Sequence, residues 1–353
     1  MMYLLNMKNT IIKIVFIVMI NILLVNCQNK KQKINMEEKF SWGASVTGAQ
    51  YYSIEVHEGY LATKKEFITG LSNAGTQDDS WLSDGSDCNS GGDSIPTLVS
   101  ITWLSYAEKT FWKLDEGVLN SDLILGYFKK GYNNYAQPFT GKLVHETYNH
   151  ITVAVAPGGE VGVFLTGKWH RVLVGRFKAS KIDIKPNQFY DNSHNRNQQQ
   201  FYDTFFSFLT EETKADIKKN GIPLGLWSQY DERYNYRIIP QFYKDDFFSA
   251  LHNSYFNGEE EYIYKDELSK KVYYNKVLPK IAYLIFSKYN FNATFDWQEL
   301  HEAFLTLTKN DKNANVDIVA KIGFEYNTVT FSAKCGDKII PLLKTKGETH
   351  SNE

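Results

Sequence analysis

The sequence lacks an excess of charge of either sign. Its 353 residues include 39 Lys and Arg against 40 Asp and Glu, which gives a formal net charge of -1. A protein that binds nucleic acid through a basic surface needs a clear excess of Lys and Arg, so we predict no nucleic-acid partner. Proline is also scarce, with 8 residues beside 23 glycines. This composition excludes a collagen-like or low-complexity chain, and the 43% of hydrophobic residues predicts a globular protein.

Familiar catalytic and metal-binding motifs are missing. The chain has no GxSxG, HExxH, CxxC, P-loop or GxGxxG pattern. His145 and His150 stand five residues apart, which predicts opposite faces of one strand, so they are poor partners for one metal ion. His57 stands between Glu55 and Glu58, a pattern that is more often found on a strand surface than at an acid–base site. We therefore predict no catalytic residues, no metal site and no cofactor.

Long apolar runs are also rare, and the clearest lies near the N-terminus. Lys8 and Lys13 precede an apolar run over residues 14–25, which Asn21 alone interrupts. This run is about a dozen residues long, whereas a membrane-spanning helix needs about 20, so a secretory signal is the better interpretation. An uncleaved N-terminal anchor helix is the alternative.

The end of this run resembles a bacterial lipoprotein signal. Cys27 follows the apolar residues directly, although Asn26 takes the place of the usual small residue before the cysteine. The resemblance implies a signal peptide over 1–26, lipid attachment at Cys27 and a polar tether over 27–37. No Asp follows the cysteine and no acidic cluster stands in the tether, so the resemblance implies the periplasmic face of the outer membrane. Membrane lipid is then a partner through acylated Cys27.

Cysteine is scarce, with three residues in the whole chain. If Cys27 is acylated, Cys88 and Cys335 remain in an oxidising compartment, where they can form a disulfide. Cys88 stands in the Gly- and Ser-rich segment DGSDCNSGGDS, and Cys335 stands in the turn-like AKCGDK. A disulfide between Cys88 and Cys335 is therefore possible, with two unpaired thiols as the alternative.

Aromatic residues, in contrast, are abundant at 15% of the chain, which favours strands. Alternation of apolar and polar residues predicts strands over 40–47, 54–62 and 98–106, and a β-meander over 142–183. Amphipathic patterns predict helices over 121–132, 201–219 and 296–308, the first capped by Ser121 and the last by Asp296. The predicted fold class is α+β, with a predominantly antiparallel sheet in a sandwich or meander and a few short helices.

A polar stretch over residues 187–200 predicts a domain boundary. We expect an N-terminal β-rich domain over 38–186 and a C-terminal α+β domain over 197–345, with packing of the two into one unit as the alternative. Residues 70–95 are rich in Gly, Ser and Asp and predict an exposed loop. Several further expectations concern side chains: a solvated face for the meander's Lys and Arg residues, a charged turn at 259–261, and core positions for Trp42, Trp103, Trp112 and Trp227.

Four strings of the sequence resemble one family. They are FSWGASVTGAQYYSIEVHEGYL, SITWLSYAEKTFWKLDEGV, APGGEVGVFLTG and GIPLGLWSQYDERYNYRI, which lie in this order within residues 38–240. They resemble a family of Gram-negative lipoproteins known as domain of unknown function 2931. The resemblance brings no activity and no catalytic residues. It implies a setting beside secreted antibacterial effectors such as lipases, where periplasmic lipoproteins act as immunity factors.

These features together predict a lipid-anchored periplasmic binding protein without catalytic activity. The most specific hypothesis is an immunity protein whose partner is a secreted protein effector. Two alternatives remain. One is a glycan- or envelope-polymer-binding lipoprotein that uses exposed Tyr and Trp rings. The other is an unrecognised hydrolase, in which His57 or His170 would lie near carboxylates and a serine.

Overall fold

The structure is a computed structural model that describes residues 39–77, 80–137, 140–190, 192–241, 248–324 and 326–351. The predicted signal peptide, the tether and Cys27 lie outside the described residues. Residues from Lys39 onward cluster into one compact unit. Within the described part of the chain, no helix has the length and apolarity that a membrane crossing requires.

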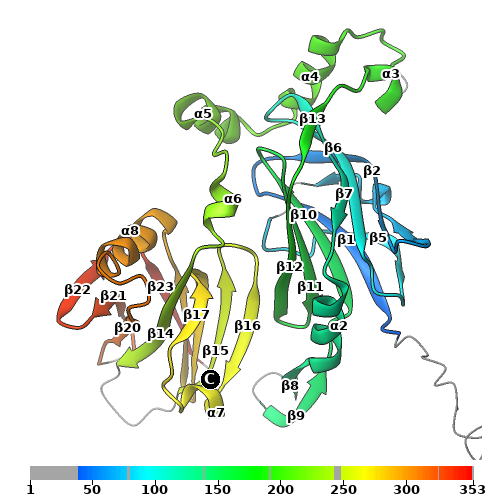
Figure 1. The fold of residues 1–353 in the computed structure, drawn as a ribbon. Coiled ribbons are helices and arrows are strands. Elements are labelled where there is room, and N and C mark those ends of the chain that lie inside the picture. Colours follow the sequence, from blue (N-terminus) through cyan, green and yellow to red (C-terminus); the bar gives the residue numbers. More distant parts are fainter. Residues whose placement is uncertain are drawn as a thin grey trace, which may run out of the picture. The chain divides into compact units, whose positions relative to one another are not determined.

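The largest sheet contains ten strands (Figure 1). In chain order these are β1 (Trp42–Gly48), β5 (Ser86–Gly92), β10 (His150–Ala156), β11 (Glu160–Gly167), β12 (His170–Lys178), β15 (Phe248–Tyr255), β16 (Glu260–Tyr264), β18 (Pro279–Phe286), β19 (Tyr289–Thr294) and β23 (Lys346–Ser351). Across the sheet they follow the order β23-β19-β18-β15-β16-β12-β11-β10-β1-β5. All neighbours in it are antiparallel except β1 and β10, which run parallel.

Three smaller sheets complete the β-structure. One consists of β2 (Ile54–Ala62), β3 (Phe67–Gly70), β4 (Thr76–Gln77), β6 (Leu98–Ser105), β7 (Thr110–Val118) and β13 (Ser180–Ile182). Another consists of β14 (Arg233–Gln241), β17 (Tyr274–Val277), β20 (Val316–Ile322), β21 (Val329–Cys335) and β22 (Lys338–Leu342). The third is the hairpin of β8 (Tyr132–Gln137) and β9 (Thr140–Glu146). The predicted α+β class with a mainly antiparallel sheet is confirmed.

The first half of the ten-stranded sheet packs on the β2–β6–β7 sheet. Alternate residues of β10 point to opposite faces, as the two-residue period of a strand requires. Ile151, Val153 and Val155 enter the core between the two sheets. Ala154 and Ala156 enter a second cluster on the other face, beneath the helices that follow the sandwich. Both faces of β10 are therefore buried, which explains its nearly unbroken apolar sequence.

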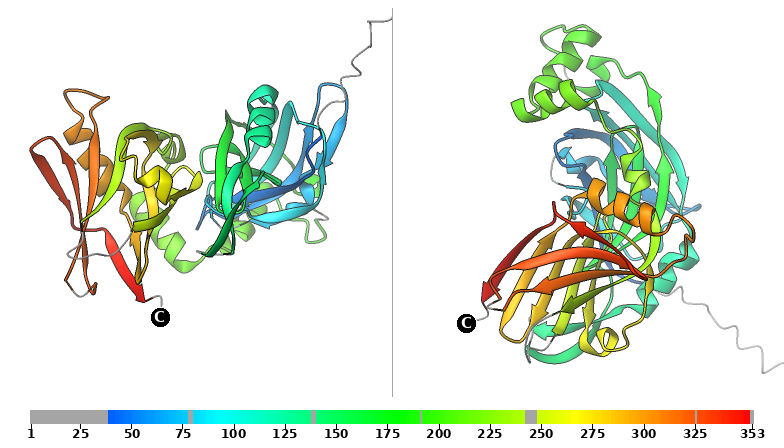
Figure 2. Two further views of the ribbon diagram at one scale, coloured as in Figure 1. Left: turned by 90° about the horizontal axis from the view of Figure 1, so that it is seen from below. Right: turned by 90° about the vertical axis from the view of Figure 1, so that its left-hand side faces the viewer.

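The second half of the sheet builds another sandwich, against β14, β20 and β21. Its core holds Leu251, Leu284 and Phe291 from the large sheet and Ile318 from the opposite sheet. Helix α8 (Trp297–Leu307) lies against β21 and β22 (Figure 1) and buries Phe304 in this core. The last strand, β23, pairs with β19 at the edge of the large sheet (Figure 2).

The helices between the two sandwiches pack on the first of them. These are α3 (Pro186–Phe189), α4 (Gln198–Ser207), α5 (Glu211–Asn220) and α6 (Leu226–Gln229). Phe201 and Phe205 of α4 contact Phe189 and join Phe111 of β7 in one aromatic cluster. The core of the second sandwich begins only at Tyr234, so these helices belong with the first. The predicted domain boundary at 187–200 stays a prediction.

Several local predictions are confirmed and several are wrong. Asp296 caps α8 as predicted, because its carboxylate accepts a hydrogen bond from the Glu299 amide. The helix α2 (Ser121–Lys130) exists, but Asn120 rather than Ser121 is its N-cap. The predicted helix over 201–219 is broken into α4 and α5, since Thr210 starts a new capped helix.

The other differences lie in segments whose conformation depends on distant contacts. The expected loop over 70–95 contains a 3-10 helix, η1 (Ser72–Ala74), as well as β4 and β5. Trp81 within it is 3% exposed, because its indole N–H donates to the Asn257 carbonyl in the other sandwich. The string LGLWSQY, which we predicted as a strand, forms α6 after Gly225, whose φ of 81° breaks the extended path.

Candidate functional site

A cleft of about 630 Å³ lies where the two sandwiches meet. The β8–β9 hairpin and β12 contribute one wall, and β16, β17 and the short helix α7 (Lys265–Leu268) contribute the other. Its volume falls within the 300–1,000 Å³ typical of ligand pockets. We call it the junction cleft. The charged and aromatic residues that line it include Tyr132, His145, His170, Arg171, Arg233, Glu259, Glu260, Glu261, Tyr262 and Lys276.

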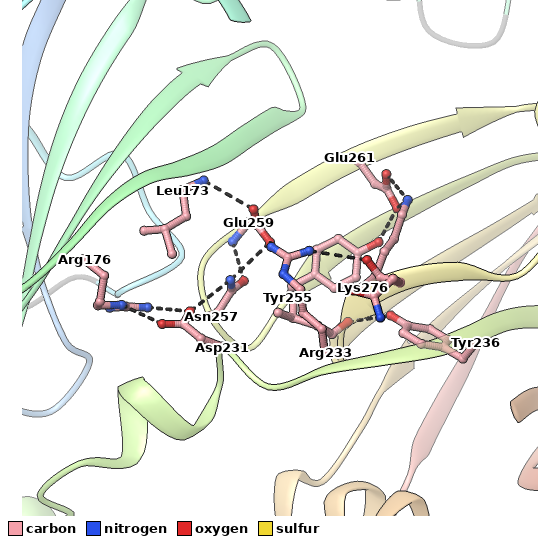
Figure 3. A network of polar contacts seen from close by, with 12 residues as sticks. Leu173, Arg176, Asp231, Arg233, Tyr236, Tyr255, Asn257, Glu259, Glu261 and Lys276 are labelled. Atoms are coloured by element: carbon pink, nitrogen blue, oxygen red, sulfur yellow. Dashed lines mark hydrogen bonds and ion pairs between the residues drawn. The ribbon is translucent and has the colours of Figure 1, made fainter. Parts of the chain in front are cut away.

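Three consecutive glutamates at the start of β16 each have a separate partner. Glu259 accepts from the Arg233 guanidinium at 2.8 Å. Glu260 lies 2.6 Å from Nε2 of His252. Glu261 pairs with the Lys276 ammonium and accepts from the Tyr255 hydroxyl (Figure 3). These side chains are 13–25% exposed. The expected charged turn at 259–261 is thus wrong, because cations and hydroxyls from other strands cover the carboxylates.

Arg171 is the most deeply buried cation of the cleft, with 2% of its surface exposed. One guanidinium nitrogen donates to the carbonyls of Trp81, at 2.7 Å, and Gly258, at 3.3 Å. The guanidinium lies 4.0 Å from the centre of the Phe164 ring, a cation–π contact. Burial lowers the pKa of Arg171 to about 10, so the side chain stays charged at neutral pH. Arg171 also stands opposite Glu260 in the single described residue pair that links β12 to β16 and so connects the two halves of the large sheet.

Arg176 makes a second connection between the sandwiches. Its Nε and Nη2 donate to the two carboxylate oxygens of Asp231, each at 2.7 Å (Figure 3). Asn257 donates to both Asp231 and Glu259, at 3.3 and 3.2 Å, and so links this ion pair to the cleft. Ser228 of α6 adds a hydrogen bond of 2.7 Å to Glu160. The expected solvated face is therefore wrong for Arg171 and Arg176, whose side chains point into the junction.

His170 lies against an aromatic wall of the cleft. Its ring stacks on Tyr132 with 3.9 Å between the ring centres and an interplanar angle of 11°. Nδ1 lies 3.1 Å from the Lys168 carbonyl; a carbonyl only accepts, so Nδ1 carries the proton and Nε2 is left as an acceptor. Burial lowers the pKa of His170 below its ordinary value, so the ring is neutral at pH 7. Burial also raises the pKa of Tyr132 to about 12.

The tyrosines of the cleft cover one another. Tyr262 stacks on Tyr264 at 4.7 Å, and Tyr148 packs edge-on against Tyr132 at 5.2 Å. Tyr148, Tyr255, Tyr262 and Tyr264 are each at most 9% exposed. The faces of these rings are thus largely used in packing within the protein.

The cleft is lined by charged side chains of both signs and by tyrosines. Its described lining contains no Ser, Thr or Cys that could act as a nucleophile. Among the described residues, no three His, Cys, Asp or Glu side chains are placed to hold one metal ion. The carboxylates at 259–261 are engaged with the partners given above, so the site offers fixed hydrogen-bonding groups of both charges.

The residues singled out in the sequence lie in different places. His57 packs against Phe189, with 5.2 Å between the rings, away from the cleft. His145 lies on β9 and lines the cleft, whereas His150 lies on β10, 3.5 Å from Asp87. They are on different strands, so the prediction that they occupy opposite faces of one strand is wrong.

The two described cysteines lie in separate parts of the fold. Cys88 is buried in the core of the first sandwich, 3.7 Å from the Leu71 carbonyl. Cys335 ends β21 and packs against the core of the second sandwich. The disulfide between them stays a prediction, and Cys27 lies outside the described residues.

Sequence reasoning placed none of the junction residues together. Arg171 donates to Trp81, which lies 90 residues away in the sequence. Arg176 pairs with Asp231, which lies 55 residues away. The one available signal is the presence of Arg171 and Arg176 in a strand where apolar and basic residues alternate. That signal cannot distinguish an exposed arginine from a buried one.

The described residues form two β-sandwiches with the junction cleft between them. Residues 27–225 match the family described as protein of unknown function (DUF2931), and the chain belongs to this family. The matched residues include the first sandwich and α3–α5, while the second sandwich follows them. No curated protein and no solved structure matches the chain.

Proposed function

We propose that this protein is a lipid-anchored periplasmic binding protein without catalytic activity, and that the junction cleft receives a segment of a protein partner. The observation that carries the proposal is the lining of the cleft, which combines buried charges of both signs with tyrosine side chains. Its described residues include no serine or threonine hydroxyl that could act as a nucleophile. Tyr and Arg are enriched at the centres of protein interfaces, because they combine apolar area with hydrogen bonding.

A protein partner fits the cleft better than a glycan does. Sugar binding through aromatic residues requires ring faces that are open to solvent. The faces of Tyr132 and Tyr262 are covered by His170 and Tyr264. Leu143, at 39% exposure, is an apolar residue of the lining that is open to solvent, and it lies beside the exposed His145 on β9. An apolar residue flanked by charges is typical of a protein contact.

A hydrolase is less well supported. His170 does lie in the cleft, and Glu260 and Glu261 act on its pKa. However, Glu260 contacts His252 and Glu261 pairs with Lys276, so neither carboxylate orients the His170 ring. The Nδ1 proton of His170 is directed to a backbone carbonyl instead. A catalytic arrangement of base, orienting acid and nucleophile is not assembled among the described lining residues.

The most specific form of the proposal is an immunity protein. The partner would be a toxic effector delivered into the periplasm, as the setting implied by the family resemblance suggests. Binding of a loop of the effector in the cleft would hold the toxin inactive by steric cover and charge complementarity. Acylated Cys27 would keep the protein on the periplasmic face of the outer membrane, where such an effector arrives.

Binding to the products of neighbouring genes tests this proposal. The chain from residue 28 onward, which retains the whole compact unit, is titrated with each neighbouring effector in a calorimeter. We expect one effector to bind, and Leu143→Asp to weaken that binding about tenfold or more, because it places a charge at an exposed apolar residue of the cleft that the partner would cover. Val118→Asp makes the same change at a 66% exposed residue outside the cleft and should leave binding unchanged.

The outcomes of this titration separate the versions of the proposal. If no neighbouring product binds, the immunity function is abandoned. If an effector binds the Leu143→Asp and Val118→Asp variants equally well, the effector is the partner but it binds at a surface other than the junction cleft.

A further inference from the structure

A second cavity, of about 530 Å³, lies inside the second sandwich. Strands β14 and β17 form one side, β15 and β16 form the other, and α7 borders the opening. Protein interiors are normally packed without voids much larger than a water molecule. A cavity of this size between two sheets is in the range of ligand pockets. We call it the sandwich cavity.

Aliphatic and aromatic side chains form most of its wall. Ile238 and Leu251 are 7% and 3% exposed and face the cavity from opposite sheets. Phe248 and Ile263 extend this surface along β15 and β16. At the opening, Val272 is 42% exposed beside α7. A continuous apolar wall from the core to the surface is suited to a hydrocarbon chain.

Polar groups lie at several places in the lining, Asn253 of β15 and Tyr274 of β17 among them. At the inner end, Tyr255 donates to Glu261, and Lys276 neutralises the same carboxylate. These residues line the junction cleft as well, so they separate the two cavities. The other polar groups lie on β14 and around α7.

The charge around the cavity favours an anion. Its lining has four cationic side chains, those of Arg237, Lys265, Lys271 and Lys276, against the carboxylates of Glu261 and Glu267. Asp317 pairs with Arg237 and Lys270 pairs with Glu267, so these two outside partners add one charge of each sign. Lys271 is exposed at the opening, and within the described residues no carboxylate lies within ion-pair distance of it.

We propose that the sandwich cavity binds a long-chain fatty carboxylate, with the hydrocarbon chain between β14 and β15 and the carboxylate at Lys271. Burial of each methylene group of the ligand contributes about 0.8 kcal/mol, so chain length is the main determinant of affinity. The carboxylate stays at the opening, because burial of an unpaired anion among Ile238, Leu251 and Ile263 would be costly. This site is independent of the protein partner proposed for the junction cleft.

Displacement of a fluorescent fatty acid tests the inference. cis-Parinaric acid is added to the chain from residue 28 onward, and its fluorescence is then competed with palmitate, octanoate and monopalmitoylglycerol. We expect palmitate to displace the probe, octanoate to need a concentration higher by a factor of about 10³ or more, and monopalmitoylglycerol to bind more weakly than palmitate. A lysophosphatidylglycerol arm distinguishes a free fatty acid from an anionic lipid headgroup as the source of the anion.

Two variants and their matched controls locate the site. Val272→Asp should weaken probe binding about tenfold, because it places a negative charge, the same sign as the carboxylate of the probe, at the apolar opening. Leu343→Asp, at an 86% exposed residue outside the cavity, should leave probe binding unchanged. Lys271→Glu should weaken palmitate binding and leave monopalmitoylglycerol binding unchanged, whereas Lys64→Glu, at an exposed residue in the turn between β2 and β3, should change neither.

Three results would overturn the inference. One is a folded protein that does not enhance the fluorescence of the probe. The second is equal displacement by octanoate and palmitate, which would mean that the chain does not enter an apolar cavity. The third is equal weakening by Val272→Asp and Leu343→Asp, which would place the binding elsewhere.

Discussion

Arg176 and Asp231 form a two-point ion pair, with both hydrogen bonds 2.7 Å long, across the junction of the two sandwiches. Arg176 stands on β12 within the residues that match the DUF2931 family, and Asp231 lies just beyond them. The pair is partly buried, with 21% and 29% of the side chains exposed. The two parallel hydrogen bonds therefore hold the start of the second sandwich against the family region in one orientation, which a single hydrogen bond would leave free to rotate.

A double-mutant cycle on this pair should give a measurable coupling. Arg176→Ala and Asp231→Ala are each expected to lower the free energy of unfolding, with a coupling energy of about 1 kcal/mol between them. Urea denaturation of the wild type, the two single variants and the double variant measures it. As a control, the exposed Lys39–Asp93 pair should give a smaller coupling. Strict additivity of Arg176→Ala and Asp231→Ala would contradict the assigned role.

Loss of Arg171 should destabilise the fold more than loss of Arg176. Arg171→Ala leaves the Trp81 and Gly258 carbonyls without their donor and removes the contact with Phe164, so we expect the free energy of unfolding to fall by about 3 kcal/mol. Arg171→Lys should recover only part of this, because an ammonium does not reproduce the planar guanidinium. A loss below about 1 kcal/mol in urea denaturation would show that the buried cation is not a structural connection.

Acid should weaken the fold through His170. Burial, as the largest cause, lowers its pKa below the ordinary 6.5. At a pH between the lowered pKa of the folded state and the ordinary pKa of the unfolded state, the unfolded chain binds a proton that the folded chain does not. The free energy of unfolding therefore falls as the pH decreases below about 6.5. His170→Gln should remove this part of the pH dependence, whereas His194→Gln, at an exposed loop residue, should retain it. Unfolding free energies at pH 7 and pH 5 provide the comparison, and an unchanged slope for His170→Gln would refute the prediction.

The two cysteines outside the N-terminal region should differ in reactivity. Burial raises the pKa of Cys88 to about 11, and only the thiolate reacts with alkylating agents. In the reduced protein at pH 8, iodoacetamide should modify the half-buried Cys335 first and Cys88 only after denaturation. Mass spectrometry of the alkylated peptides measures this order. The same digest under non-reducing conditions tests the Cys88–Cys335 disulfide.

The sequence was sufficient for the elements whose residues determine their own conformation. The strand β6 and the capped helix α8 follow from local alternation and from Asp296. Trp42, Trp103 and Trp112 lie in strands and are at most 7% exposed, as the alternation predicts, whereas Trp227 is equally buried but lies in α6 instead of the expected strand. The junction could not be predicted in this way. Arg171 has the same sequence surroundings as a solvated strand residue, and only Trp81 and Gly258, 90 and 87 residues away, make its burial favourable.

Photo-crosslinking inside the cell tests the central claim, that the junction cleft is the surface that holds the partner. A photoreactive benzoylphenylalanine is placed at Leu143, in the cleft, or at Val118, outside it, in cells that also produce the neighbouring effector. We expect an adduct with the effector from residue 143 and none from residue 118, and no adduct from residue 143 when Cys27→Ser removes the anchor. Adducts of equal yield from both residues, or none from residue 143 in the anchored protein, would contradict the account.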